Sequence, residues 1–495
     1  MQITKLRGML AAITTAGLFG IAPAAMADST TDIVNALMAK GVLTEEEGQL
    51  LLKGRTLEQD AEGKKAKKAW TNSINIRGYV QNRTTEMLSG DEGVVLWPDP
   101  SVGDEDSGSG RGQTFRIRRA RLIFSGNVGD HLGFYIQPDF ASTSGDTGNI
   151  AQLRDAYGDI FVDKEQVHRF RVGQSKVPYG YENLQSSSNR LALDRVDALN
   201  SAVRDERDTG VFYYYTPKNV QALFKEINDL GLKHSGNYGM FGIGAYMGQG
   251  ANQNDLNDNW HNVARFTYPW KTESGQIYEA GIQGYKGKYV RTAGSYRRAN
   301  AAGVQGSTTA VVDPKYQKTG NSTCWNTAAG APTCGEFDDE RIAVSFRMYP
   351  QPWGLEGEWT WGTSPGLDMD AGNIVSGRRT GQIKNQSLHG GYVQGSYFAH
   401  DVRVFDTNIG HLIPFVKWQY FDGYNKAEVN APANHVNDWE WGVEWQIAPE
   451  VEIAAVYHHM KRTNMTTSGK FNTENGSYQT FNAEALRIQL QYNFP

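Results

Sequence analysis

The fold is decided by short stretches that alternate between apolar and polar residues, such as WEWGVEWQI at residues 439–447. The odd positions there carry Trp, Val or Ile, and the even positions carry Glu, Gly or Gln. Because successive side chains of a strand point to opposite faces, this strand has one apolar and one polar face. Residues 341–348 and 486–494 repeat the pattern. Such alternation is typical of barrel strands that face lipid on one side and water on the other.

Sixteen segments carry this alternation, an even number, as single-chain bacterial barrels require. They span residues 72–83, 114–126, 131–141, 152–162, 166–178, 208–217, 237–249, 260–270, 276–288, 338–349, 352–363, 387–400, 410–422, 437–448, 450–461 and 480–494. Residues 220–227 are ambiguous. We interpret them as part of a longer connection, with a helix as one form that it can take.

The connections between these segments alternate in length. The long ones are 84–113, 179–207, 289–337, 364–386, 423–436 and 462–479, and short ones include 127–130, 163–165 and 271–275. Outer-membrane barrels have short periplasmic turns and long external loops, and here 218–236 is the exception. A soluble β-sandwich would not usually give this two-sided rhythm. The sequence therefore predicts an all-β chain, a sixteen-stranded antiparallel transmembrane β-barrel with a short helical N-terminal periplasmic segment.

The first 27 residues have the pattern of an export signal. Lys5 and Arg7 form a basic start, an apolar stretch follows, and residues 25–27 form a small-x-small cleavage site. A retained membrane anchor is the alternative. No later run of about 18 apolar residues predicts a transmembrane helix. We expect a cleaved signal peptide (1–27), a periplasmic helical and basic segment (28–70) and an outer-membrane barrel (71–495).

The N-terminal segment differs in pattern from the barrel. Residues 32–40 are expected to be helical, Gly41 ends that helix, and Thr44 with Glu47 resembles a capping box for a second one. A basic stretch, GKKAKK, follows at residues 63–68. We interpret this segment as solvated, with a periplasmic oligomerisation or envelope-binding element as the alternative.

The remaining motifs exclude several function classes. The net charge of −5 shows no basic excess for nucleic acid. No zinc-protease, hydrolase or P-loop motif is present, and neighbouring His458 and His459 would face opposite sides of a strand, so we expect neither an enzyme nor a cofactor or metal site. Cys324 and Cys334 lie close together in the longest external loop, and we interpret them as a disulfide that stiffens it.

Strand parity assigns a set of basic side chains to the lumen. Arg119 and Arg121 face inward because Ala120, Leu122 and Phe124 occupy the lipid-facing positions. The same parity turns inward Arg77, Arg83, Arg341, Arg347, Lys417 and Arg487. A guanidinium suits an oxyanion that sheds part of its hydration. The alternative is that these cations pair with inward acids and merely line the wall, since Asp155, Asp159, Glu356, Glu358, Glu440 and Glu444 share that parity.

Two segments then give a specific resemblance. FRIRRARLIF (115–124) and FRVGQSKVPY (170–179), followed by the serines and arginine of 186–190, resemble the phosphate-selective porin O and P family. LRDAY (153–157) and the terminal QYNF (491–494) fit the same pattern. The resemblance implies a sixteen-stranded trimeric porin whose anion path is lined by arginines and lysines. It also implies an external loop that folds inward and constricts the pore.

The resemblance and the parity together set the functional expectation. We expect passive diffusion of small anions, with phosphate as the candidate, along a path of Arg77, Arg119, Arg121, Lys176, Arg341, Arg347 and Arg487. The constriction loop, 179–207, would contribute Arg190 and Arg195. Outer-membrane lipid and lipopolysaccharide would be partners, the assembly would be a homotrimer, and nucleic acid would not be bound. A general or weakly selective porin for other solutes is the alternative.

Overall fold

A computed structural model describes most of the chain and divides it into two compact units, Met1–Ser73 and Ile74–Pro495. The described residues are 34–35, 37–40, 42–44, 46–53, 74–91, 94, 96, 114–144, 147–302, 304–317, 325–326, 331–332, 334–464 and 479–494.

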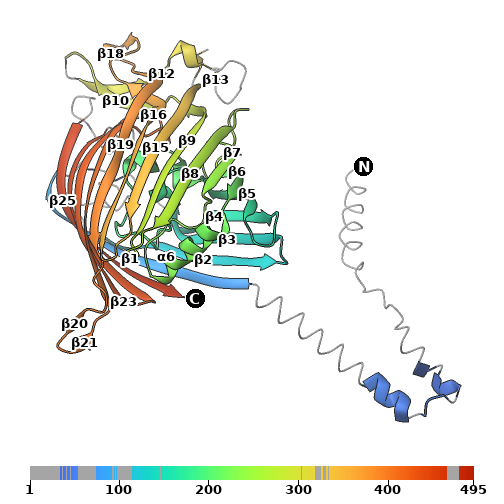
Figure 1. Cartoon of the computed structure of the whole chain (residues 1–495). Helices are drawn as coiled ribbons and strands as arrows, with labels where there is room; N and C mark the ends of the chain where they lie inside the picture. The colour runs from blue at the N-terminus through green and yellow to red at the C-terminus, as the bar shows by residue number, and fades with distance from the viewer. Residues whose placement is uncertain are drawn as a thin grey trace, which may run out of the picture. The chain divides into compact units, whose positions relative to one another are not determined.

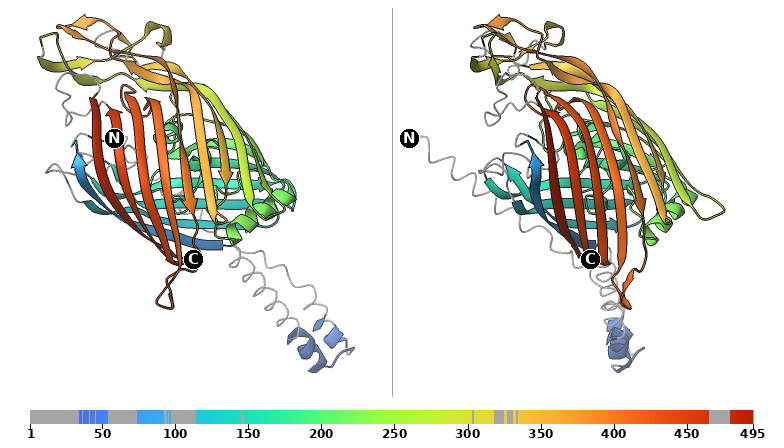
Figure 2. Two further views of the ribbon diagram at one scale, coloured as in Figure 1. Left: turned by 60° about the vertical axis from the view of Figure 1, so that its left-hand side comes forward. Right: turned by 90° about the vertical axis from the view of Figure 1, so that its left-hand side faces the viewer.

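In the second unit, sixteen antiparallel strands each pair with the next, and the last pairs with the first to close a barrel (Figures 1 and 2). The strands are β1 (Ile74–Gly90), β2 (Thr114–Val128), β3 (Leu132–Ser144), β4 (Thr147–Phe161), β5 (His168–Lys176), β6 (Arg207–Tyr215), β7 (Phe241–Tyr246), β8 (His261–Lys271), β9 (Ile277–Thr292), β15 (Cys334–Met348), β16 (Trp353–Asp368), β19 (Gln382–Tyr397), β22 (His411–Tyr424), β23 (Ala433–Ala448), β24 (Val451–Asn464) and β25 (Gln479–Phe494). Each of the sixteen predicted segments falls on one of these strands, so the predicted fold class is confirmed.

Several strands extend beyond their predicted ends. β1 continues to Gly90, so the prediction of a loop from residue 84 is wrong at its start, and β9 continues to Thr292. In these extensions several outward positions are polar, as with Thr84 and Glu86 of β1. The alternation of apolar and polar residues ends at the edge of the lipid-facing apolar band. The backbone hydrogen bonds between neighbouring strands continue beyond that edge. The sequence pattern therefore marks the apolar band and misses the extension above it.

Short elements decorate the connections. One end of the barrel carries the long connections, and we call it the long-loop end; its small elements are β10 (Ser295–Ala299), β11 (Gln305–Thr309), β12 (Val311–Val312), η2 (Pro314–Tyr316), β13 (Trp325–Asn326), β14 (Ala331–Pro332), β17 (Ile374–Val375) and β18 (Arg378–Arg379). The opposite, short-turn end carries the hairpin of β20 (Arg403–Val404) and β21 (Thr407–Asn408), together with the C-terminus (Figure 1).

The wall is two-sided, as the alternation predicts. Membrane-facing side chains such as Ile282, Ile342 and Trp361 are exposed. Inward side chains such as Arg487 and Lys417 are almost completely buried. Because side chains of a strand alternate, the apolar band outside and the polar lining inside are two consequences of one pattern.

The ambiguous segment is a helix. α6 (Lys218–Asp229) lies in the connection from β6 to β7, at the short-turn end (Figure 1). Its buried residues Val220, Phe224 and Ile227 share one apolar cluster with Leu191 and Leu193 of the β5–β6 connection. The cluster also includes Ile413, Phe415 and Val456 from the wall. This exceptional long connection therefore packs into the barrel end.

The first unit is described in part. Residues 34–35, 37–39 and 46–53 are helical, and Thr44 and Glu47 form the predicted capping box. Thr44 N–H donates to Glu47 Oε2 at 2.9 Å, and Glu47 N–H donates to Thr44 Oγ1 at 3.3 Å. The predicted signal peptide (1–27) and the basic stretch at 63–68 lie outside the described residues. Over the described ranges, no helix is both long and apolar enough to cross a membrane.

Replacement of Phe224 tests whether α6 is anchored by apolar packing. Phe224→Ala is expected to lower the free energy of unfolding by about 3 kcal/mol, because a large buried side chain leaves a cavity between helix and wall. Lys225→Ala, on the exposed side of α6, is the control and should change it by less than about 0.5 kcal/mol. Urea unfolding of the reconstituted protein measures both, and equal effects would contradict the packing.

Candidate functional site

The connection from β5 to β6 lies inside the barrel. It spans residues 177–206, which we call the inward loop, and contains α4 (Tyr181–Leu184), α5 (Asp197–Asn200) and η1 (Arg204–Glu206). Most of its side chains are buried. Helices of three or four residues have almost no stability of their own, so the surrounding wall must hold the loop in place.

Wall residues bind the loop from several strands. The Glu358 carboxylate of β16 accepts hydrogen bonds from Tyr181 N–H at 2.7 Å and Glu182 N–H at 3.2 Å. Arg341 of β15 donates to Ala198 O at 2.9 Å and to Ser201 O at 3.1 Å.

Ion pairs add to these contacts on strands β22 and β24. Lys417 pairs with Glu182 of the loop, and Arg462 Nη1 lies 3.1 Å from Asp197 Oδ2. Charge-assisted hydrogen bonds of this kind are stronger than neutral ones, so they fix the loop across the lumen.

Within the loop, an acid is held between two arginines. Arg195 Nη1 lies 2.7 Å from Glu206 Oε1, and Arg207 Nη1 lies 2.9 Å from Glu206 Oε2. Burial by itself would raise the pKa of Glu206, but the two guanidiniums outweigh it and hold this pKa below its ordinary value. Glu206 therefore stays ionised and locks the end of the loop.

The densest positive charge gathers around Asp194 of the loop. Arg83 Nη1 and Arg487 Nη2 lie 3.0 Å and 2.6 Å from Asp194 Oδ2. Arg118 Nη2 and Arg119 Nη2 each lie 3.9 Å from Asp194 Oδ1. Strands β25, β1 and β2, which are neighbours across the barrel closure, supply these four guanidiniums. We call this group, Arg83, Arg118, Arg119, Arg487 and Asp194, the Asp194 cluster.

A fifth guanidinium stands beside the cluster. Arg190 of the loop acts electrostatically on Arg119 and donates to Leu193 O at 3.3 Å. Its Nε and Nη1 have no hydrogen-bond partner in the part of the chain that the structure describes. Five guanidiniums thus gather at or beside one loop carboxylate.

A β-bulge explains how two consecutive arginines join the cluster. Gln81 pairs with Arg119, but Asn82 pairs with Ile117, so Arg118 is the extra residue of β2. Parity alone would turn Arg118 toward lipid. The bulge re-aims it, because an extra residue bends the strand and shifts the alternation by one. Arg118 therefore points toward Asp194 together with its neighbour.

The other predicted path residues occupy different settings. Arg121 Nε lies 2.7 Å from Asp139 Oδ2, and Arg347 pairs with Glu356 and contacts Tyr181. Lys176 Nζ donates to Leu184 O at 2.9 Å and to Gln185 O at 2.6 Å. These contacts match the wall-lining alternative and the anchoring of the loop.

Three predicted residues of the path and loop remain to be placed. Arg341 anchors α5 through the contacts above, and Arg195 donates to Gln185 O at 2.8 Å as well as pairing with Glu206. Arg77 lies apart from the Asp194 cluster, near the start of β1, and is exposed. The structure thus brings Arg119, Arg190 and Arg487 together and leaves Arg77 separate.

The structure describes one of the two cysteines of the predicted disulfide. Cys334 is buried at the start of β15 and is disulfide-bonded. Cys324 lies outside the described residues, so the Cys324–Cys334 pairing stays a prediction. Within the described ranges, no group of three or more His, Cys, Asp and Glu side chains is arranged to hold a metal ion.

Comparison with known proteins places this geometry in a family. The model of the family described as phosphate-selective porin O and P matches residues 94–494. The chain belongs to this family. It is therefore an outer-membrane porin, and a search of curated proteins gave no match.

Solved porin structures are similar to this family member at low identity. The outer-membrane channel DcaP of Acinetobacter baumannii is 14% identical with a TM-score of 0.45, over 85% of this chain and 97% of that one. OmpT of Vibrio cholerae, in trimer form, is 12% identical with a TM-score of 0.46, over 85% and 99%. An anion-selective porin from Comamonas acidovorans is 11% identical with a TM-score of 0.44, over 85% and 99%. Likenesses this distant carry no information on the solute.

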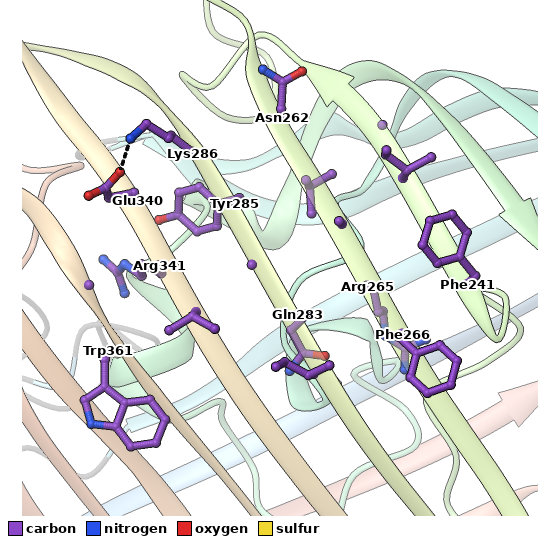
Figure 3. A pocket seen from close by; sticks show the side chains of 18 residues that line it. Phe241, Asn262, Arg265, Phe266, Gln283, Tyr285, Lys286, Glu340, Arg341 and Trp361 are labelled. Atoms are coloured by element: carbon purple, nitrogen blue, oxygen red, sulfur yellow. Dashed lines mark ion pairs between the residues drawn. The ribbon is translucent and has the colours of Figure 1, made fainter.

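A hollow in the wall lies away from the Asp194 cluster, across strands β7–β9, β15 and β16 (Figure 3). The small residues Gly244, Ala264 and Gly284 line the hollow. At its edge, Lys286 pairs with Glu340 at 2.7 Å. Trp361 and Ile342 line it and are exposed on the membrane side. We assign it no part in solute passage.

The porin should depend on the Asp194 carboxylate for its loop conformation. Asp194→Asn is expected to lower the free energy of unfolding by about 3 kcal/mol, because it removes the carboxylate charge that pairs with four clustered guanidiniums. Asp205→Asn removes a loop carboxylate that is one-third exposed and pairs with Arg154, and should cost less than about 1 kcal/mol. Urea unfolding measures both variants. Equal small losses would show that Asp194 does not hold the loop.

Proposed function

We propose that this porin passes small anions by diffusion, with phosphate-type oxyanions as its preferred solutes. The observation that carries the proposal is the Asp194 cluster with Arg190, five guanidiniums around one carboxylate at the inward loop. A guanidinium keeps its charge at any working pH and offers several donors, which suits an oxyanion that sheds some water. Weak multiple sites of this kind let an ion enter and leave.

The arginines divide into two roles in this proposal. Arg119, Arg190 and Arg487 form the anion-attracting side, because guanidiniums from the wall and from the loop gather there at or beside one carboxylate, Asp194. Arg121, Arg341, Arg347, Arg195 and Lys176 hold the wall and the loop, because carboxylates or carbonyls of the protein already engage them.

A general, weakly selective porin is the second candidate, and acidic side chains on the inner face favour it. Glu358 receives neutral donors, including the Gln283 amide at 2.6 Å, and Glu440 has Gln419 at 3.5 Å. Both side chains are buried on the inner face. Acidic groups there would offset the arginine side and reduce any preference for anions.

The remaining expectations join the proposal. We propose that residues 1–27 are a cleaved export signal, that residues 28–70 lie in the periplasm, and that the barrel assembles as a homotrimer, as the family resemblance implies. Lipopolysaccharide is the proposed partner of the long-loop rim. Exposed outer-face charges there, including Lys286 beside Glu340, support this contact.

The reversal potential in a planar bilayer under a KCl gradient tests the function. We expect a reversal potential on the anion-selective side, and we expect phosphate to block the chloride current. Arg119→Gln and Arg190→Gln should each weaken the block about tenfold, because each removes a charge-assisted hydrogen bond to the oxyanion.

Lys286→Gln is the matched control, because it removes one positive charge from the outer face of the wall. It should leave selectivity and block unchanged. A reversal potential near zero, or on the cation side, would overturn anion preference and favour the general porin.

A further inference from the structure

A row of planar side chains crosses the inner wall near the short-turn end. Tyr135 of β3 is the direct partner of Tyr157 of β4. Their rings are parallel to within 6°, with centroids 5.1 Å apart. The guanidinium of Arg171 on β5 lies 3.7 Å from the Tyr157 centroid. Tyr157 is therefore covered by Tyr135 from one neighbouring strand and by a cation from the other.

The strand register places small polar residues on the other side of Tyr135. Its partner on β2 is Ser125, and the partner of Ser125 on β1 is Asn75. Both are small polar residues, and Tyr135 is only half-buried. Over the described part of the chain, Tyr157 is the one ring that packs on Tyr135. The ring is held upright, since its hydroxyl donates to Gln137 Oε1 at 2.9 Å.

An exposed cation, Arg77, lies near Tyr135 on the inner face. Arg77 of β1 has the inward parity of its buried neighbours Tyr79 and Gln81, and it is exposed to the lumen. It acts electrostatically on the Tyr135 hydroxyl. No ion pair of Arg77 occurs among the described residues, whereas Arg171 is bound through two nitrogens to Asp159, at 2.8 Å and 2.9 Å. Arg77 is thus the cation of this region that keeps its charge for a solute.

We propose that Tyr135 and Arg77 form a binding subsite for planar organic anions, with aromatic carboxylates as the ligand class. The ligand ring stacks on the open face of Tyr135 above Ser125, and its carboxylate meets the Arg77 guanidinium. Aromatic stacking and charge-assisted hydrogen bonding are independent contributions, so a ligand with both binds better than one with the charge alone. The subsite rests on the proposed function only in requiring an open lumen, and it adds a solute class to the inorganic oxyanions.

The subsite is tested by block of the chloride current in planar bilayers. Benzoate is the aromatic probe, acetate supplies the carboxylate without the ring, and phosphate reports the Asp194 cluster. In the wild type, benzoate should reach half-block at a concentration about fivefold below that of acetate. Tyr135→Leu should remove this difference and leave acetate and phosphate block unchanged, while Tyr135→Phe should retain it. Arg77→Gln should weaken the block by benzoate and the block by acetate to the same extent.

Two further variants make the result specific. Ser125→Leu keeps the tyrosine and fills the space beside it, so it should also abolish the benzoate advantage, and it serves if Tyr135→Leu does not fold. Tyr213→Leu, on the opposite face of the wall, is the control and should behave as wild type. Equal block by benzoate and acetate in the wild type, or the same change in Tyr213→Leu, would overturn the subsite. The reversal potential without benzoate reports the proposed function separately.

Discussion

Pairing of β1 with β25 is the contact on which the rest of the structure depends. The two strands run side by side from the pair Gly78 and Phe494 to the pair Gly90 and Ala483. A bilayer core offers no water to an unpaired strand edge, and each unsatisfied backbone group there costs several kcal/mol. Closure removes both edges at once. It also brings β25, β1 and β2 together, and these strands supply the wall arginines of the Asp194 cluster.

The inward loop occupies part of the space that the closed wall encloses. The loop has no core of its own, so its conformation follows from buried charges and amides presented by the wall, such as Glu358, Arg341 and Arg462. Removal of one partner of a buried pair leaves the other unsatisfied, which makes the arrangement rigid. α6 adds an apolar support at the short-turn end, through Phe224 and Leu193.

Basic and acidic side chains alternate around the inner wall. Arginines of β1, β2 and β25 gather at Asp194 where the first and last strands meet, and Glu440 of β23 lies within electrostatic reach of Arg487. Lys417 of β22 pairs with Glu182 of the loop. Charge-assisted contacts therefore hold the loop at several points around the wall.

The sequence by itself determined the sixteen strands and the side of the wall on which most residues lie. An apolar residue at every second position is a local property, and burial against lipid enforces it. Parity therefore placed Arg119 and Arg487 inward correctly. The tertiary structure alone decided the inward position of Arg118, because the bulge depends on how β2 pairs with Gln81 and Asn82. The tertiary structure also decided which arginines pair with Asp194. Contacts across a lumen join residues hundreds of positions apart, and no local pattern records them.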